Sequence, residues 1–246
     1  MKISISLFFI IAFLNSISQV ETYTNYRYLD NYFNAFCIKI DISTINNFDI
    51  LQNKSKENHD HFINNIIKKD SFQYLITASI SDKNCQPEGF FALNHKVVNK
   101  VNFKNGNGNG NFYLKPNGAF LVTSDSVIIC ESDLIANYKD IRLGIQSGPM
   151  LVSNNSIISN LNRNSTNRNI RCGVGEFSDS LGNKYLIFVS SSSAVTFYEL
   201  ANLFYERFKC SNALCLESIN SGMYYPGIPL IPNQKSVICN YIRYKE

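Results

Sequence analysis

The stretch GIQSGPMLVSNNSIISNLNRNSTNRNIRCGVG, residues 144–175, carries the most information about the fold. It begins with a short apolar strand, turns at residues 147–149 (Ser-Gly-Pro) and resumes as a second strand at residues 150–152. Gly and Pro supply backbone angles at such a turn that other residues resist. A polar loop rich in Asn and Ser follows, and a third strand is predicted at residues 171–177.

Two arginines, Arg168 and Arg171, lie three residues apart where the long loop enters the third strand. A guanidinium group donates hydrogen bonds in a fixed fork, which matches anions rich in acceptors such as a phosphodiester. Beside a glycine-containing turn, the pair predicts an anion clamp. The alternative is an ordinary turn and two arginines that are solvated or ion-paired, which is the usual state of surface arginines.

The composition favours one sizeable globular domain. Hydrophobic residues make up 45% of the 246-residue chain and charged residues 17%, which is ordinary for such a domain. The net charge of +4 is spread thinly along the sequence, so neither nucleic-acid binding nor membrane binding is indicated.

The N-terminus has the features of a secretory signal peptide. Lys2 precedes an apolar run at residues 5–14, and residues 16–18 (Ser-Ile-Ser) offer a cleavage site of small residues. The run is too short to span a bilayer, and no later segment is apolar for long enough. We therefore predict a protein that is secreted or periplasmic and has no transmembrane segment. The predicted divisions are a signal peptide at residues 1–18, a lead-in at residues 19–35 and the domain at residues 36–246.

The cysteines indicate no metal site. None forms a Cys-x-x-Cys pair or a Cys/His cluster, and no acidic cluster has calcium-loop spacing. We predict no cofactor and no metal, and leave metal dependence open. In an oxidising compartment some cysteines should form disulfides, and the odd count leaves at least one free. The spacing does not determine which ones pair, and Cys210 and Cys215 fit buried thiols equally well. The seven cysteines lie at positions 37, 85, 130, 172, 210, 215 and 239.

Before the 144–175 stretch, the pattern predicts several strands, one short helix and one loop. Residues 62–69 are predicted as the helix. His59 and His61 stand at its start, where we expect both to face solvent rather than a metal. Residues 104–111 (KNGNGNGN) are expected to form a loop, because Gly and Asn tolerate turn conformations. The strands are predicted at residues 36–42, 72–78, 112–114, 119–122 and 126–130.

A strand, a helix and a second strand are predicted near the C-terminus. The first strand is YLIFVS at residues 185–190, and the second is NALCL at residues 212–216. Between them, Thr196 and Glu199 form a capping box, in which each side chain satisfies an open backbone donor, and the helix continues to about residue 209. A crossover of this length should place the two strands parallel. The fold class is therefore α+β, a single mixed-sheet domain with a few helices.

The carboxyl ends of these two strands form a candidate site. Residues 191–193 and Glu217 would emerge there, where open α/β sheets usually bind ligands. Glu217 is a candidate for chemistry, and a solvated loop carboxylate is the alternative. The serines at residues 190–193 do not indicate a serine nucleophile, because no Gly-x-Ser-x-Gly elbow surrounds them and no His lies nearby in the sequence.

Five blocks of sequence carry a family resemblance. Together they resemble the phosphodiester glycosidase domain family, from about residue 36 to about residue 225, and look closer to its secreted bacterial branch. That family includes the enzyme that removes N-acetylglucosamine from mannose-6-phosphate diesters. The blocks are NFYLKPNGAF at 111–120, QSGPMLV at 146–152, RNIRCGVG at 168–175, VTFYELANLF at 195–204 and CSNALCL at 210–216.

The resemblance implies hydrolysis of a sugar-1-phosphodiester at its glycosidic bond, on surface or extracellular glycans. Arginines and backbone amides would hold the phosphodiester and stabilise the charge on the leaving phosphate. A carboxylate would activate water or support an oxocarbenium-like transition state. By resemblance, Glu217, Arg171 and Arg168 are the catalytic residues. The substrate-binding residues implied in the same way are Lys115, Asn117, Gln146, Ser147, Gly148 and Ser221.

Two blocks depart from the family's pattern. The family usually has Leu-Asp-Gly and then a Ser, whereas this chain has Leu216, Glu217 and Ser218, with Ser221 further on. Glu keeps the charge but moves it outward by about one methylene, and a shift near 1 Å can cost on the order of 100-fold in rate. The family's Asn-Ala-Gly-Met-Phe is TASIS here, at residues 77–81. The alternative to an active enzyme is therefore an inactive member that binds a phosphorylated glycan or a protein partner.

Overall fold

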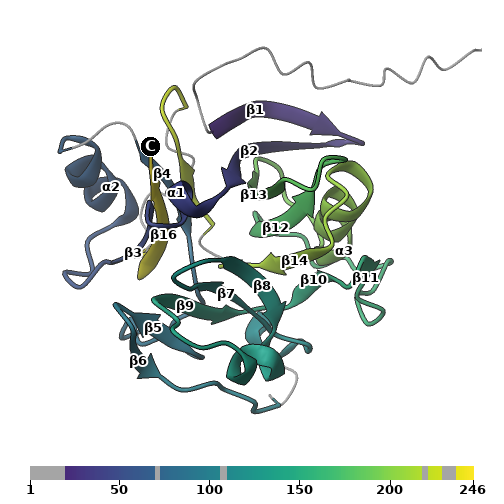
Figure 1. The fold of residues 1–246 in the computed structure, drawn as a ribbon. Coiled ribbons are helices and arrows are strands. Elements are labelled where there is room, and N and C mark those ends of the chain that lie inside the picture. The colour runs from purple at the N-terminus through teal and green to yellow at the C-terminus, as the bar shows by residue number, and fades with distance from the viewer. Residues whose placement is uncertain (1–19, 70–72, 106–109, 218–220, 229–236) are drawn as a thin grey trace, which may run out of the picture.

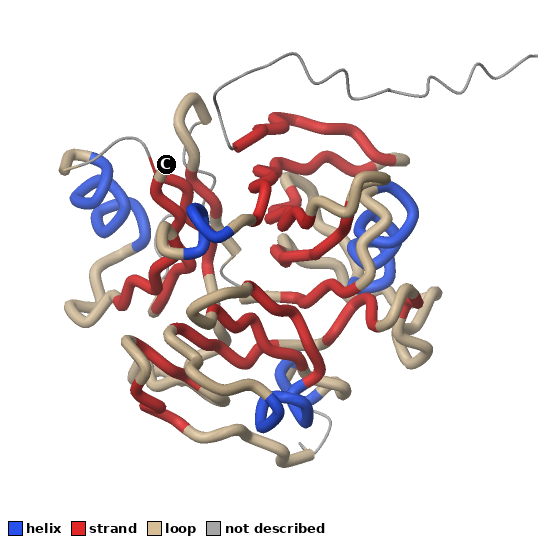
Figure 2. Tube along the Cα trace, viewed as in Figure 1, coloured by secondary structure: helices blue, strands red, loops and turns tan. Residues whose placement is uncertain are grey.

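The computed structural model describes residues 20–69, 73–105, 110–217, 221–228 and 237–246. The predicted signal peptide, part of the Gly/Asn loop and Ser218 lie outside these residues. The described chain forms three sheets and a few short helices, which confirms the α+β class. Figure 1 shows the sheets arranged around a common centre, and Figure 2 shows helices on the outside of the molecule.

A seven-stranded sheet is the largest element, and each neighbouring pair in it is antiparallel. Its central strands are buried on both faces. In β13, Phe188 packs into the core shared with the other sheets, while Val189 packs under α3. The strand is a continuous apolar run because its side chains are buried on both faces of the sheet. In sheet order the strands are β1 (Val20–Tyr28), β2 (Asn31–Ile40), β13 (Lys184–Ser191), β12 (Cys172–Ser178), β14 (Asn212–Cys215), β10 (Met150–Ser153) and β11 (Ser156–Ile157).

Two smaller sheets pack against the inner face of the seven-stranded sheet. Phe36 of β2, Ile76 of β4 and Phe120 of β7 belong to one buried cluster, so the three sheets share a core. The four-stranded sheet has the order β15 (Met223–Tyr224), β4 (Gln73–Thr77), β16 (Asn240–Lys245) and β3 (Phe48–Gln52). The five-stranded sheet has the order β6 (Lys96–Asn99), β5 (Phe91–Leu93), β9 (Leu143–Ser147), β7 (Gly118–Val122) and β8 (Val127–Glu131).

Helices cover the outer faces of these sheets (Figure 1). The predicted capping box starts α3 (Phe197–Asn202): Glu199 N donates to Thr196 Oγ1 at 3.1 Å, and Thr196 N donates to Glu199 Oε2 at 2.8 Å. A π-helical turn, η3 (Leu203–Arg207), continues it. Phe204 packs so close to β12 that a Cβ on Gly175 would lie 2.7 Å from its ring, so only glycine fits there. The other helices are α1 (Ile42–Ile45), α2 (His59–Ile67), η1 (Asn111–Tyr113) and η2 (Ser132–Asn137).

Most predicted elements are present, and three expectations differ from the structure. Residues 20–35, expected as a lead-in, form β1 and the first half of β2 at the edge of the large sheet. The strand predicted at residues 112–114 is wrong: Tyr113 N bonds back to Gly110 O at 3.2 Å, which makes the 3-10 turn η1. His59 does not face solvent, because α2 packs on β16, where the His59 Nδ1 lies 2.7 Å from the Tyr241 hydroxyl. That burial lowers the pKa of His59.

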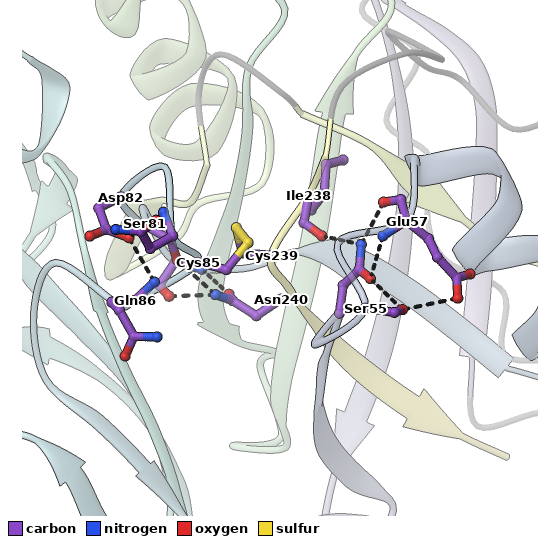
Figure 3. The surroundings of a disulfide bond; sticks show 12 residues. Ser55, Glu57, Ser81, Asp82, Cys85, Gln86, Ile238, Cys239 and Asn240 are labelled. Carbon is purple, nitrogen blue, oxygen red and sulfur yellow. Dashed lines mark hydrogen bonds between the residues drawn. A yellow bond between two sulfur atoms is a disulfide. The ribbon is translucent and has the colours of Figure 1, made fainter.

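The cysteines divide into one disulfide and five thiols. Cys85, in the loop after β4, is bonded to Cys239, which immediately precedes β16, and the two are 154 residues apart in the sequence (Figure 3). Cys210 and Cys215 are among the buried free thiols. Among the described residues, no helix is long and apolar enough to cross a membrane.

Candidate functional site

The three sheets meet where several of the predicted site residues lie. β9 of the five-stranded sheet ends at Ser147 and β10 of the seven-stranded sheet begins at Met150, so the turn between them passes from one sheet to the next. The Pro149 carbonyl accepts a 3.0 Å hydrogen bond from Cys215 N at the end of β14. Two residues on, Glu217 N donates to Ala78 O at 2.8 Å, just after β4 of the four-stranded sheet.

The start of β12 reaches the same edge. Leu216 N donates to Cys172 O at 3.0 Å, and the Cys172 thiol donates to Glu217 O at 2.9 Å. Arg171 precedes Cys172, and its backbone exchanges hydrogen bonds with Ser191 at the end of β13. β12 is antiparallel to both β13 and β14, so these two strands are parallel to each other, as predicted, with β12 between them. Their carboxyl ends therefore lie at one edge of the sheet.

The Arg171 side chain is fully buried and incompletely paired. Its Nε donates to Val195 O at 2.9 Å and its Nη2 to Asn167 O at 3.1 Å. The guanidinium carbon lies 3.6 Å from the centre of the Phe197 ring, a close cation–π contact. Among the described residues, Nη1 has no hydrogen-bond partner. Burial lowers the pKa of Arg171, yet a guanidinium stays charged, so an open cationic donor lies at this edge.

Arg168 lies in a different setting. Its Nη1 donates to Glu199 Oε1 at 2.8 Å, its Nε to Ala194 O at 3.1 Å and its Nη2 to Asn31 Oδ1 at 3.2 Å. Its side chain is 44% exposed. Each guanidinium nitrogen is thus occupied, and the ion-paired alternative holds for Arg168. Of the two arginines expected to form a clamp, Arg171 is the one with a nitrogen that has no partner within the described part of the chain.

Asn117, Ser147 and Gly148 form the turn side of the site. Asn117 and Ser147 are buried, and neither the amide of Asn117 nor the hydroxyl of Ser147 has a hydrogen-bond partner among the described residues. A Cβ on Gly148 would lie 2.8 Å from Asn117 Oδ1, so glycine lets the turn approach this amide closely. Buried polar atoms without partners are rare in folded proteins, and several of them near one sheet junction fit a place where a polar ligand binds.

The remaining predicted ligands support the backbone or lie to one side. Gln146 Oε1 accepts from Phe90 N and Asn102 N, both at 2.9 Å, and its Nε2 donates to Asn102 O at 2.9 Å, so its amide is committed to the backbone. Ser221 Oγ donates to Glu217 O at 2.6 Å and fixes the main chain there. Lys115 is partly buried, with its Nζ 5.6 Å from the Phe112 ring centre, and burial lowers its pKa.

The charges of Arg171 and Glu217 act on the same thiol. Burial raises the pKa of Cys215, the Arg171 cation lowers it and the Glu217 carboxylate raises it. Burial also raises the pKa of Cys172 to about 12, and Glu217 adds to that rise. Arg171 and Glu217 therefore both lie within electrostatic range of Cys215.

Asn240 is a supporting residue that the sequence did not reveal. Its Oδ1 accepts from Ser79 N at 2.8 Å and from Ser79 Oγ at 3.1 Å, and its Nδ2 donates to Ser81 Oγ at 3.0 Å. Its carbonyl accepts from Ala78 N at 3.0 Å, and Ala78 O in turn binds Glu217 N. The neighbouring Cys239 is held by the disulfide (Figure 3). The partners are about 160 positions apart, so no local pattern could have found them.

Comparison with known proteins identifies the family. The family model described as phosphodiester glycosidase matches residues 70–240. The uncharacterized protein YigE of Escherichia coli (strain K12) is 32% identical over 155 residues, which are 63% of this chain and 59% of that protein. This chain thus spans less than two thirds of that relative.

Two solved structures are similar. The zebrafish N-acetylglucosamine-1-phosphodiester alpha-N-acetylglucosaminidase catalytic domain, auto-inhibited by its pro-peptide, has a TM-score of 0.63 at 13% identity, covering 94% of this chain and 85% of that one. A hypothetical protein from Synechocystis has a TM-score of 0.48 at 13% identity, covering 89% of this chain and 61% of that one. The zebrafish match supports the fold, and the family model covers well over half of the sequence. The chain belongs to the phosphodiester glycosidase family.

Proposed function

We propose that the chain is a secreted hydrolase that cleaves sugar-1-phosphodiesters of surface or extracellular glycans at the glycosidic bond. We also propose that it works more slowly than relatives with Asp at the position of Glu217. One observation carries the proposal: the buried Arg171 keeps Nη1 without a partner among the described residues, at the sheet edge where Glu217 begins its loop. A phosphodiester oxygen is the acceptor that such a donor fits.

The chemistry assigns a role to each group. Water attacks the anomeric carbon as the bond from that carbon to the phosphate oxygen breaks, and the bonding electrons leave with the phosphate. Arg171, with the buried donors of Asn117 and Ser147, stabilises the negative charge that develops on the leaving group. Glu217 accepts the proton of the attacking water and favours the positive character of the sugar carbon. A phosphate monoester leaves readily, so little help from a general acid is needed.

Two independent features support the proposed location outside the cytosol. The N-terminal residues have the pattern of a signal peptide. Cys85 and Cys239 are joined in a disulfide, which is typical of proteins in oxidising compartments. A sugar-phosphodiester substrate would then belong to an envelope or extracellular glycan.

A hydrolysis assay on the full chain tests the proposal. The substrate is an α-N-acetylglucosamine-1-phosphodiester, and the variants are Glu217→Gln and Arg171→Lys. Glu206→Gln is the matched control, because Glu206 is an exposed carboxylate whose ion pair is with Lys209. We expect turnover in the wild type and the control, and a loss on the order of 100-fold or more in the two site variants. Site variants that turn over as fast as the wild type would refute the assignment.

The second candidate function is binding without turnover. Thr77 stands where the family usually has Asn, and its hydroxyl lies 3.1 Å from the Cys172 thiol and accepts a 3.3 Å hydrogen bond from Gly222 N. Together with Glu217 in place of Asp, this favours an inactive member that binds a phosphorylated glycan. Calorimetry with a sugar 1-phosphate distinguishes the two, since binding without hydrolysis supports this candidate. Turnover gained by Glu217→Asp would show that the rest of the site is intact.

A further inference from the structure

A cavity of about 270 Å³ lies beside the N-terminus of α3, on the outer side of the seven-stranded sheet. Its walls come from three segments: the end of the 104–111 loop and η1 region, the long loop that follows β11, and the first turn of α3. Figure 1 shows α3 close to β10 and β11 at this side of the molecule. The lining residues are Gly110, Leu114, Asn160, Leu161, Asn162, Ser165, Asn167, Phe197 and Tyr198.

The lining combines aromatic rings with neutral hydrogen-bonding groups. Phe197 and Tyr198 supply the rings, while Asn160, Asn162 and Asn167 supply amides that both donate and accept. No charged side chain is among the described lining residues. A sugar ring has apolar C–H faces that pack on aromatic rings, and hydroxyls around its edge that need donors and acceptors. This lining therefore suits a neutral sugar ring better than an ion or a purely apolar ligand.

The cavity adjoins the open cationic donor described above. Phe197, which lines the cavity, stacks on the Arg171 guanidinium at 3.6 Å. Asn167, also in the lining, accepts the 3.1 Å hydrogen bond from Arg171 Nη2 through its carbonyl. A ligand in the cavity is thus separated from Arg171 by one aromatic ring and one peptide group. The cavity and the Arg171 guanidinium therefore share Phe197 and Asn167 as neighbours.

The walls are held in place without a ligand. Leu161 is buried in the core under α3, and the Asn160 side chain donates to Lys115 O. The Asn162 Oδ1 accepts a 2.9 Å hydrogen bond from Asn164 N, and the Arg163 guanidinium lies 5.1 Å from the centre of the Tyr198 ring. These contacts fix the loop and one ring before binding, which lowers the entropic cost of binding.

We propose that this cavity binds a neutral sugar ring of the substrate, next to the phosphate that Arg171 holds. The proposal rests on the proposed function for the identity of that phosphate. The volume lies slightly below the usual range for small-molecule sites, which begins at about 300 Å³, so the cavity fits one ring rather than a longer chain. The long Asn-rich loop is then a sugar-binding loop.

The test measures binding of neutral sugars and of inorganic phosphate to the full chain by calorimetry. The neutral probes are N-acetylglucosamine, glucose, galactose and mannose. We expect at least one of them to bind, Tyr198→Ala to weaken that binding about tenfold, and Tyr198→Phe to keep it. Tyr138→Ala is the matched control, because Tyr138 packs against the outer cluster of the five-stranded sheet. Inorganic phosphate binding should be unchanged in Tyr198→Ala and weakened in Arg171→Lys.

Two outcomes overturn the proposal. One is that none of the four sugars binds the wild type at high concentration. The other is that Tyr198→Ala and Asn162→Ala, checked for folding by thermal unfolding, bind the sugar as the wild type does. Asn162→Ala keeps the test decisive should Tyr198→Ala fail to fold. Sugar binding lost in these variants without any hydrolysis by the wild type would support the cavity and refute the proposed activity. Hydrolysis by the wild type, with KM unchanged in both variants, would support the proposed activity and refute the sugar site in the cavity.

Discussion

The surroundings of Arg168 and of Arg171 differ sharply, although only two residues separate these side chains in the sequence. Arg168 lies at the surface, and each of its guanidinium nitrogens has a protein partner. Arg171 is buried where β12 begins, stacks on Phe197 and keeps Nη1 without a partner among the described residues. Each guanidinium nitrogen of Arg168 already has a protein partner, whereas the unpartnered nitrogen of a buried arginine fits an acceptor on a ligand. Hydrogen-bond pairing, rather than residue type or spacing, thus separates a supporting arginine from a candidate catalytic one.

Arg171→Lys should cause the largest loss of activity. Lysine keeps the charge, but its single nitrogen cannot take the separate positions of Nε, Nη2 and Nη1, and it has no plane to stack on Phe197. We expect kcat/KM for sugar-phosphodiester hydrolysis to fall on the order of 100- to 1000-fold. Arg168→Lys is the control and should stay within about threefold of the wild type. Equal losses in both variants would show that the two arginines act as a pair after all.

Glu217→Asp should increase the activity of the site that contains Arg171. Shortening the side chain returns the carboxylate to the position that the family usually uses, and a displacement near 1 Å is worth on the order of 100-fold in rate. We therefore expect kcat to rise by roughly 10- to 100-fold, with a smaller change in KM. Steady-state kinetics on one phosphodiester substrate measures both. A fall in kcat would mean that the surrounding residues have adapted to Glu.

Asn240→Ala tests the support behind Glu217. The substitution leaves Ser79 N, buried beside it, without its acceptor, and such a loss costs about 1–3 kcal/mol. We expect the free energy of unfolding to fall by that amount in urea denaturation, and kcat to fall while KM changes little. Asn105→Ala, at an exposed position, serves as the control. If stability falls but kcat does not, Asn240 supports the fold and does not position the site.

Arg168→Ala should have the smallest effect. Exposed ion pairs contribute about 0.2–1 kcal/mol, so the free energy of unfolding should fall by no more than that at neutral pH, with hydrolysis unchanged. Burial alone would raise the pKa of Glu199, but hydrogen bonds from Thr196 and the Arg168 cation hold it below its ordinary value. A carboxyl whose pKa is lowered by folding stabilises the folded state at pH values above its pKa in the unfolded chain. This stabilisation is lost as the pH falls through its pKa in the folded protein. The stabilities of the wild type and the variant should therefore converge only at pH values below the ordinary pKa of a Glu carboxyl, which is about 4.3. A difference in unfolding free energy that persists at such low pH would not come from the ion pair between Arg168 and Glu199.

Local sequence patterns predicted the elements that depend on interactions between residues close together in the sequence. The capping box of Thr196 and Glu199 follows from residues three apart, and the turn at residues 147–149 from its Gly and Pro. The partners of Arg168 could not be predicted in this way, since Glu199 is 31 positions away in the sequence. His59 was expected in solvent because a helix start says nothing about which face packs on Tyr241. The site residues implied by resemblance likewise come together through contacts between distant segments, such as the hydrogen bond from Glu217 N to Ala78 O.

Chemical labelling of the five buried thiols can show where the folded protein opens. Their pKa values are raised by burial, so alkylating reagents in neutral buffer can reach them only when the surrounding structure opens. Cys130 lies in the five-stranded sheet, while Cys37, Cys172 and Cys215 lie in the seven-stranded one. The order in which they are labelled would thus show whether the two sheets open together or as separate cooperative units.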